Sequence, residues 1–133
     1  MRTHAPLLYL WTLLNTLLGL LPVPILLFQR SARVRIHTGV VELTGGLVTL
    51  LLTRFPAPVK PCALTLGHVV WAIDPFHLDR TRAHERIHVR QYERWGPFFL
   101  PAYLGVSLIL HLQGKDCYRD NPFEREAYDK APG

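Results

Sequence analysis

The sequence predicts an α+β fold in which a small, largely antiparallel sheet is followed by three helices and preceded by an apolar N-terminal helix. The observations behind this are a Leu-rich run at residues 5–28, short Val-, Ile-, Leu- and Thr-rich runs between residues 34 and 74, and a helical pattern after Ile73. The chain has 133 residues, enough for one compact domain, expected at 29–133, and an appended segment at 1–28.

Residues 5–28 are apolar, and the polar interruptions are Thr12, Asn15 and Thr16. At about 1.5 Å per residue, a helix of this length can cross a hydrocarbon core of about 30 Å. Pro22 and Pro24 kink or end such a helix, and one that ends near residue 21 is marginal for spanning. We expect a membrane-associated helix, with a cleaved signal peptide or a buried helix of a soluble core as alternatives.

The net charge of the chain is +5 at pH 7. A basic chain with long apolar runs fits an anionic membrane surface, and the sequence shows no RNA- or DNA-binding motif, so we expect no nucleic-acid partner. Arg30, Arg33 and Arg35 follow the apolar run directly, whereas Arg2 alone precedes it. The positive-inside tendency therefore predicts that the rest of the chain lies in the cytoplasm.

The two cysteines, Cys62 and Cys117, are isolated in the sequence. They form no CxxC pair, so they indicate neither a disulfide framework nor a cysteine zinc site. Two reduced thiols are expected, with a single disulfide as the alternative.

Strand signals occupy the part of the chain before Asp74. Short apolar runs broken by Gly and Pro predict strands near 33–38, 40–44, 47–53 and 63–73. Gly45 and Gly46 predict a hairpin turn, and the proline-rich residues 56–61 predict a loop.

The next predicted element is a long helix. Asp74 can cap it, Pro75 can occupy its first position, and Gly96 followed by Pro97 ends it. At 100° per residue, one face of this helix carries His77, His84, His88, Gln91 and Trp95. The opposite face carries Asp79, Arg82, Arg86, Arg90 and Glu93. We expect that second face to meet solvent or lipid headgroups.

His84, Glu85 and His88 form an HExxH pattern inside this helix. Side chains four apart project from one side of a helix, so two imidazoles can bind one zinc ion while the glutamate, a quarter-turn away, holds water as a general base. The alternative is a surface helix whose histidines are ordinary polar partners. Arg86 is a charged residue inside the pattern, on the predicted polar face.

A catalytic zinc needs a third protein ligand and an open position for water. Glu124 and Glu126 are the downstream candidates, in a short helix that Asn121 can cap with Pro122 at its first position. Residues two apart on a helix point about 200° apart, so only one of the two can face the metal. Glu124 could instead be a helix-capping carboxylate.

The HExxH pattern followed by Glu124 and Ala127 resembles the gluzincin branch of zinc metallopeptidases in a minimal form. The resemblance implies that Glu124 is the third ligand, beside His84 and His88. Tyr128 stands where the family has an Asp that orients a ligand histidine; Asp129 and Asp120 are candidate substitutes. Residues 64–128 also resemble an uncharacterised group of small bacterial HExxH proteins.

The apolar residues 97–112 separate the histidines from Glu124. If this segment crossed a membrane, the histidines and Glu124 would lie on opposite sides and could not share an ion. We therefore expect it to turn back as a buried or interfacial helix, with Tyr103 as an amphipathic interface residue.

The expected function is that of a membrane-associated zinc metallopeptidase acting on an extended polypeptide, with Glu85 taking a proton from the attacking water. Tyr118, Arg119 and Tyr128 are candidate oxyanion donors, and residues 67–71 are the candidate sheet edge for the substrate. His68 and His77 are expected to be structural. A non-catalytic membrane adaptor that retains a structural zinc site is the alternative, and other divalent ions suit the same ligands.

Overall fold

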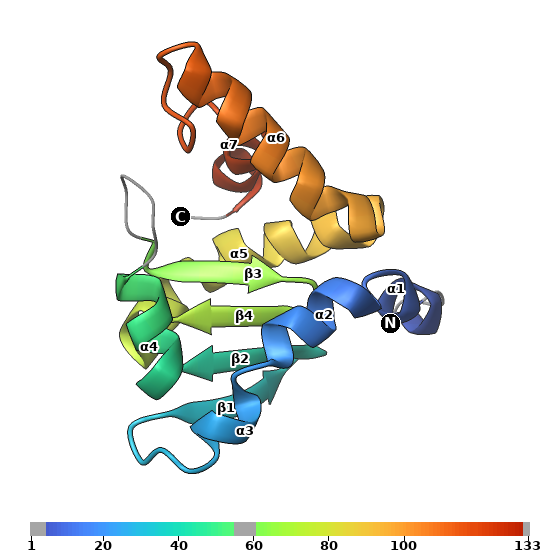
Figure 1. Cartoon of the computed structure of the whole chain (residues 1–133). Helices are drawn as coiled ribbons and strands as arrows, with labels where there is room; N and C mark the ends of the chain where they lie inside the picture. The colour runs from blue at the N-terminus through green and yellow to red at the C-terminus, as the bar shows by residue number, and fades with distance from the viewer. Residues whose placement is uncertain (1–4, 55–60, 132–133) are drawn as a thin grey trace.

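The structure is a computed structural model that describes residues 5–54 and 61–131. In this part of the chain the fold is α+β, with helices around a four-stranded mixed sheet (Figure 1). In chain order the elements are α1 (Ala5–Trp11), α2 (Leu13–Leu20), α3 (Val23–Leu26), β1 (Arg33–His37), β2 (Val40–Thr44), α4 (Gly46–Thr53), β3 (Ala63–Leu66), β4 (Val69–Ala72), α5 (Pro75–Trp95), the 3₁₀ turn η1 (Gly96–Phe98), α6 (Phe99–Leu112) and α7 (Pro122–Lys130).

The strand order is β1-β2-β4-β3. The β1–β2 and β3–β4 pairs are antiparallel, as expected, but β2 and β4 run parallel, so the sheet is mixed. The run at 63–73 is two strands, because the chain turns at Gly67, whose φ is +61°. This hairpin places β4 inside the sheet and β3 at its edge.

The strand predicted at 47–53 is wrong, because this segment forms helix α4. Gly45, with a φ of +79°, is the N-cap of α4, so it and Gly46 do not make the predicted hairpin turn. Val48 and Leu52, one helical turn apart, are completely buried. A short apolar run fits a strand or a buried helix equally well. Here the helix is favoured because it packs Val48 and Leu52 into the core.

Two apolar cores lie on opposite faces of the sheet. The first joins the sheet to α3 and α4 and contains Leu26, Leu43, Val48, Leu52 and Val69. The second joins the sheet to α5 and contains Val40, Val70, Ala72, Leu78 and Val89. Helix α5 therefore covers one face of the sheet, while α2, α3 and α4 lie on the other (Figure 1).

The apolar N-terminal run forms α1, α2 and α3: α2 ends at Leu20, just before Pro22, as the prolines predict, and a further break lies at Thr12. Its polar residues have buried partners: Asn15 Nδ2 donates to the Gly96 carbonyl at 3.1 Å, and Thr12 Oγ1 lies 2.8 Å from His68 Nδ1. These bonds attach the segment to the domain, while most of its leucines stay exposed. Its membrane association stays a prediction, and Arg2 lies outside the described residues.

One helical stretch in the described chain, Pro75–Leu112, is long and apolar enough to cross a membrane by length and composition. It contains α5, η1 and α6, and its apolar part is α6, where Phe99 is the buried residue. After α6 the chain reverses, and α7 returns to pack beside α5 (Figure 1). The prediction that residues 97–112 turn back is confirmed.

Both cysteines are free thiols in the structure. The loop predicted at 56–61 falls outside the described residues, except for Pro61.

Candidate metal centre

Helix α5 carries the HExxH residues in its middle. Asp74 caps the helix, because its Oδ1 accepts from the His77 backbone N–H at 2.8 Å, and Pro75 follows as the first helical residue. His77 Nδ1 also contacts Asp74 Oδ1 at 2.8 Å, so His77 belongs to this cap, as expected of a structural histidine. Gly96, with a φ of +60°, ends the helix.

Part of the polar face of α5 contacts the sheet, through Arg82 and Arg86, whereas Asp79 and Arg90 are exposed, as predicted. Arg82 holds both carboxylate oxygens of Glu42 on β2, at 2.9 and 3.0 Å, and Arg86 contacts Glu42 at 3.3 Å. Arg86 also donates to the His37 carbonyl and to Thr38 Oγ1, each at 2.6 Å. The charged residue inside the HExxH pattern therefore fixes the helix to the β1–β2 hairpin.

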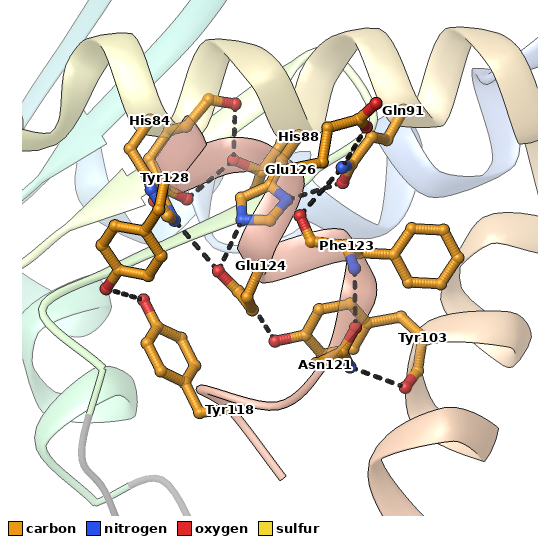
Figure 2. Close-up of polar contacts among 12 residues, drawn as sticks. His84, His88, Gln91, Tyr103, Tyr118, Asn121, Phe123, Glu124, Glu126 and Tyr128 are labelled. Atoms are coloured by element: carbon orange, nitrogen blue, oxygen red, sulfur yellow. Dashed lines mark hydrogen bonds and ion pairs between the residues drawn. The ribbon is translucent and has the colours of Figure 1, made fainter. Parts of the chain in front are cut away.

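Three side chains from two helices converge beside α5. Glu124 Oε1, from α7, lies 3.0 Å from His84 Nε2 and 3.0 Å from His88 Nε2 (Figure 2). Asn121 is the N-cap of α7, since its Oδ1 accepts from the Phe123 N–H at 2.9 Å, so Glu124 is not the capping residue. The structure thus brings together the three predicted ligand residues.

The donor set fits a zinc ion. Two ligand atoms at about 2.0–2.1 Å from a tetrahedral zinc lie about 3.3 Å apart, close to the observed 3.0 Å between Glu124 Oε1 and each histidine nitrogen. His84, Glu85 and His88 also offer ligand atoms within 4.8 Å of one another. Imidazole and carboxylate ligands accept other divalent ions as well, so the set could hold a divalent cation, zinc among them.

Glu85 lies beside this set and is held apart from it. Its Oε1 accepts from Thr65 Oγ1 on β3 at 2.9 Å, and its Oε2 is 3.9 Å from His84 Nε2. Burial raises the pKa of Glu85, against the opposing effects of His88, His84 and Thr65. A buried carboxylate with a raised pKa, next to a cation site, suits a group that accepts a proton and gives it back.

His88 is oriented by Gln91, which the sequence places on the histidine face. Gln91 Oε1 lies 2.8 Å from His88 Nδ1, and Gln91 Nε2 donates to Glu126 Oε1 at 2.7 Å and to the Phe123 carbonyl at 2.9 Å. Gln91 is completely buried. This chain of contacts gives His88 an orienting partner, a role for which Asp120 and Asp129 were the candidates, and it places Glu126 beside Gln91 (Figure 2).

Tyr103 on α6 holds the other oxygen of Glu124. Its hydroxyl donates to Glu124 Oε2 at 2.5 Å, and burial together with the charge of Glu124 raises the pKa of Tyr103. Both carboxylate oxygens of Glu124 are therefore engaged, one by the histidines and one by Tyr103. The interpretation of Tyr103 as an interface residue missed this contact.

The candidate oxyanion donors lie at different places. Tyr118 lines the cleft beside the site, and its hydroxyl is 3.0 Å from the Tyr128 hydroxyl. The Tyr128 ring lies 4.5 Å from the His84 ring, centroid to centroid. Arg119 is exposed and is not among the residues that line the cleft. The geometry therefore keeps Tyr118 and Tyr128 as candidates and removes Arg119.

Protonation of the metal-free site follows from these contacts. Burial alone would lower the pKa of His88, but its hydrogen bond to Glu124 and the charges of Glu85 and Glu124 raise it to about 9. Burial alone would raise the pKa of Glu124, but its hydrogen bonds to His84 and His88 lower it to about 2. Without a metal, the positive charge of protonated His88 partly balances the negative charges of Glu85 and Glu124.

A cavity of about 440 Å³ opens beside Glu85, His88 and Glu124, between β3 and α6. The predicted substrate edge at residues 67–71 is wrong, because β4 pairs with both β2 and β3 and is therefore internal. The edge strand that lines the cavity is β3.

His68 is structural, as expected. Its Nδ1 lies 2.8 Å from Thr12 Oγ1, its Nε2 lies 2.8 Å from Glu93 Oε2, and its ring stacks on Tyr9 at 4.0 Å. These contacts join the N-terminal helices to α5, away from the candidate ligands.

No protein-family model, curated protein or solved structure matches this chain. The interpretation of the site therefore rests on its own residues and their geometry.

Proposed function

We propose that this chain is a zinc metallopeptidase that hydrolyses a peptide bond in an extended polypeptide at or near a membrane. The observation that supports the proposal is the position of Glu124 Oε1, 3.0 Å from both HExxH imidazoles, with Glu85 held to one side by Thr65. Two histidines that met by chance on a helix would need no buried carboxylate between them. Here Glu124, 36 residues after His88 in the sequence, supplies one.

The chemistry divides between the ion and the chain. A bound zinc supplies Lewis acidity, which polarises a carbonyl and makes water a nucleophile near neutral pH. Glu85 takes a proton from the attacking water and delivers it to the leaving amine, and the pKa that burial raises favours its acceptance of the proton. Tyr118 is the candidate in the cleft for donating to the developing oxyanion.

The substrate position follows from β3. The Thr65 carbonyl accepts from the Tyr92 hydroxyl at 2.9 Å, so the backbone groups of Thr65 point away from β4 and toward the cleft. In an antiparallel pair, residues two apart present their backbone groups on the same side, so those of Ala63 share this direction. An extended peptide lying along β3 can pair there with its scissile bond near Glu85.

Membrane association belongs to the proposal on two grounds. Exposed leucines on α1 and α2, and exposed apolar residues on α6, give the molecule apolar surface that water does not favour. Arg30 and Arg33 follow this apolar N-terminal segment, which supports a cytoplasmic position for the metal centre by the positive-inside tendency.

The test compares Glu85→Gln with the wild type after loading with zinc. We expect Glu85→Gln to keep its zinc, because Glu85 is not a proposed ligand, and to lose peptide hydrolysis by a factor of at least about 10². Asp79→Asn is the matched control: it removes the same charge from an exposed position of α5, where Asp79 pairs with Arg82. Hydrolysis of a mixed peptide substrate and bound zinc are both measured.

The alternative of a non-catalytic adaptor makes a different prediction. Tyr128 stands where gluzincins have an Asp that orients a ligand histidine, and the missing Asp favoured the adaptor. In this chain Gln91 contacts His88 in place of such an Asp. An adaptor would bind zinc, show no zinc-dependent hydrolysis in the wild type, and keep its cellular activity in Glu85→Gln. That combination would remove the peptidase proposal.

A further inference from the structure

The cleft beside the metal centre has a polar end and an apolar wall. Glu85, His88 and Glu124 lie at the polar end. The wall carries the aliphatic and aromatic residues Leu64, Leu66, Tyr92, Phe99, Leu100 and Leu104. The volume of the cleft, about 440 Å³, lies in the range of roughly 300–1,000 Å³ typical of pockets that enclose small ligands.

The remaining hydroxyl groups of the wall already have partners in the protein. Ser107 Oγ lies 3.3 Å from the Cys117 carbonyl and accepts from Asn121 Nδ2 at 3.0 Å. Tyr118 contacts the hydroxyl of Tyr128. Among the described residues that line the cleft, the ionisable acids and bases other than tyrosine and cysteine are the three at the polar end. A charged substrate side chain would therefore find no counter-ion among the described residues of the wall.

We infer that the substrate of this proposed peptidase carries a large apolar side chain, such as Leu, Ile, Phe or Met, next to the scissile bond. The inference rests on the proposed function and names its substrate class. A peptide along β3 would pass between that strand and α6, where Leu100 and Leu104 line the cleft and would meet a side chain next to the reacting carbonyl. Burying an apolar group there is favourable, whereas burying an unpaired charge is costly.

Leu104 is the specificity-determining residue that best tests the inference. It lines the cleft, yet its side chain is 55% exposed, so a polar replacement does not disrupt a core. Leu108, one turn further along α6, is 58% exposed and is not among the residues that line the cleft. Leu104→Glu and Leu108→Glu therefore make the same chemical change on the same helix, and only the first alters the cleft.

The first experiment incubates the zinc-loaded full chain, in detergent, with a mixed library of unfolded peptides, and sequences the cleavage sites by mass spectrometry. We expect large apolar residues to be enriched by about tenfold or more at one position beside the cut, the scale at which an apolar pocket discriminates. Leu104→Glu should reduce this enrichment, and Leu108→Glu should leave it unchanged. Cleavage without apolar enrichment would overturn the inference and leave the peptidase proposal standing.

The second experiment measures binding and needs no turnover. N-blocked amino acid hydroxamates with a Leu or an Asp side chain are titrated into the zinc-loaded protein by calorimetry, and we expect the Leu compound to bind about tenfold tighter or more. That preference without any hydrolysis would support the apolar subsite and count against the peptidase proposal. Equal affinity for the two compounds, or a preference that survives in Leu104→Glu, would refute the inference.

Discussion

His88 is held at both ring nitrogens, by Gln91 on one side and Glu124 on the other. A fixed ring direction matters because partners behind a ligand histidine typically contribute 10- to 100-fold to metal affinity. We therefore expect Gln91→Ala to weaken zinc binding by about that factor, measured by competition with a chromophoric chelator. Arg94→Ala, which removes an exposed partner of Glu126, should change the affinity by less than about threefold. An unchanged affinity in Gln91→Ala would show that Gln91 orients nothing.

The raised pKa of His88 makes zinc affinity depend on pH. In the metal-free protein His88 keeps its proton up to a pKa of about 9, so zinc must displace that proton at neutral pH. Affinity should therefore increase by about tenfold per pH unit from pH 6.5 and level off near pH 9. Calorimetry in two buffers with different ionisation enthalpies should report release of about one proton or more. A flat profile over this range would contradict the assigned contacts of His88.

Some residues of the candidate site could be predicted from the sequence, and others could not. His84, Glu85 and His88 are local, because helical periodicity alone places them together. Glu124 came from a resemblance, and its contact with the histidines depends on the reversal after α6. Thr65 and Tyr103 touch the site from β3 and α6, and no local pattern encodes those contacts. A buried tyrosine hydroxyl that needs a partner was the available signal for Tyr103.

Helix α5 is fixed to the sheet by charged contacts on the face opposite the candidate ligands. Burial alone would raise the pKa of Glu42, but Arg82 and Arg86 outweigh that effect and lower it. The Glu42 side chain is 1% exposed. Glu42→Gln leaves the charges of Arg82 and Arg86 without their buried counter-ion and should cost about 3 kcal/mol in the free energy of unfolding. Asp120→Asn breaks the exposed pair with Arg125 and should cost at most about 1 kcal/mol. Urea unfolding measures both, and equal costs would contradict this role.

The strand predicted wrongly at 47–53 and the N-terminal run, whose environment the sequence left open, share a physical cause. The segment at 47–53 and the N-terminal run are both apolar with weak periodicity, so their local pattern does not distinguish a strand, a buried helix or a membrane helix. Packing against the sheet decided for helix α4. Hydrogen bonds from Asn15 and Thr12 attach α1 and α2 to the domain. The α5 and α7 helices were predicted well because each has a cap residue and a proline at its start.

An aromatic contact joins the N-terminal helices to η1, the turn that leads into α6. The rings of Trp11 on α1 and Phe98 on η1 have centroids 6.2 Å apart. Trp11 also packs against Gly96, where a Cβ would lie 2.0 Å from the indole. Exposed aromatic side chains that join two apolar surfaces are typical of proteins at a membrane interface.

Vesicle binding tests this surface. We expect the protein to float with vesicles that contain phosphatidylserine, and Leu14→Glu to weaken that binding, because Leu14 is 69% exposed and a charge there opposes insertion. Ile36→Glu is the control: Ile36 is 77% exposed on β1, the edge strand at the opposite side of the sheet from β3. Equal binding of the two variants would show that the N-terminal helices do not contact lipid.

We propose that His84, His88 and Glu124 share one divalent cation. Elemental analysis of the purified wild type should give about one zinc ion per chain. His88→Ala and Glu124→Ala should lose it, because each removes one of three protein ligands. Glu126→Ala should keep it at saturating zinc, since Glu126 is bonded to Gln91 and is not a proposed ligand. Zinc retained in Glu124→Ala but lost in Glu126→Ala would contradict the account.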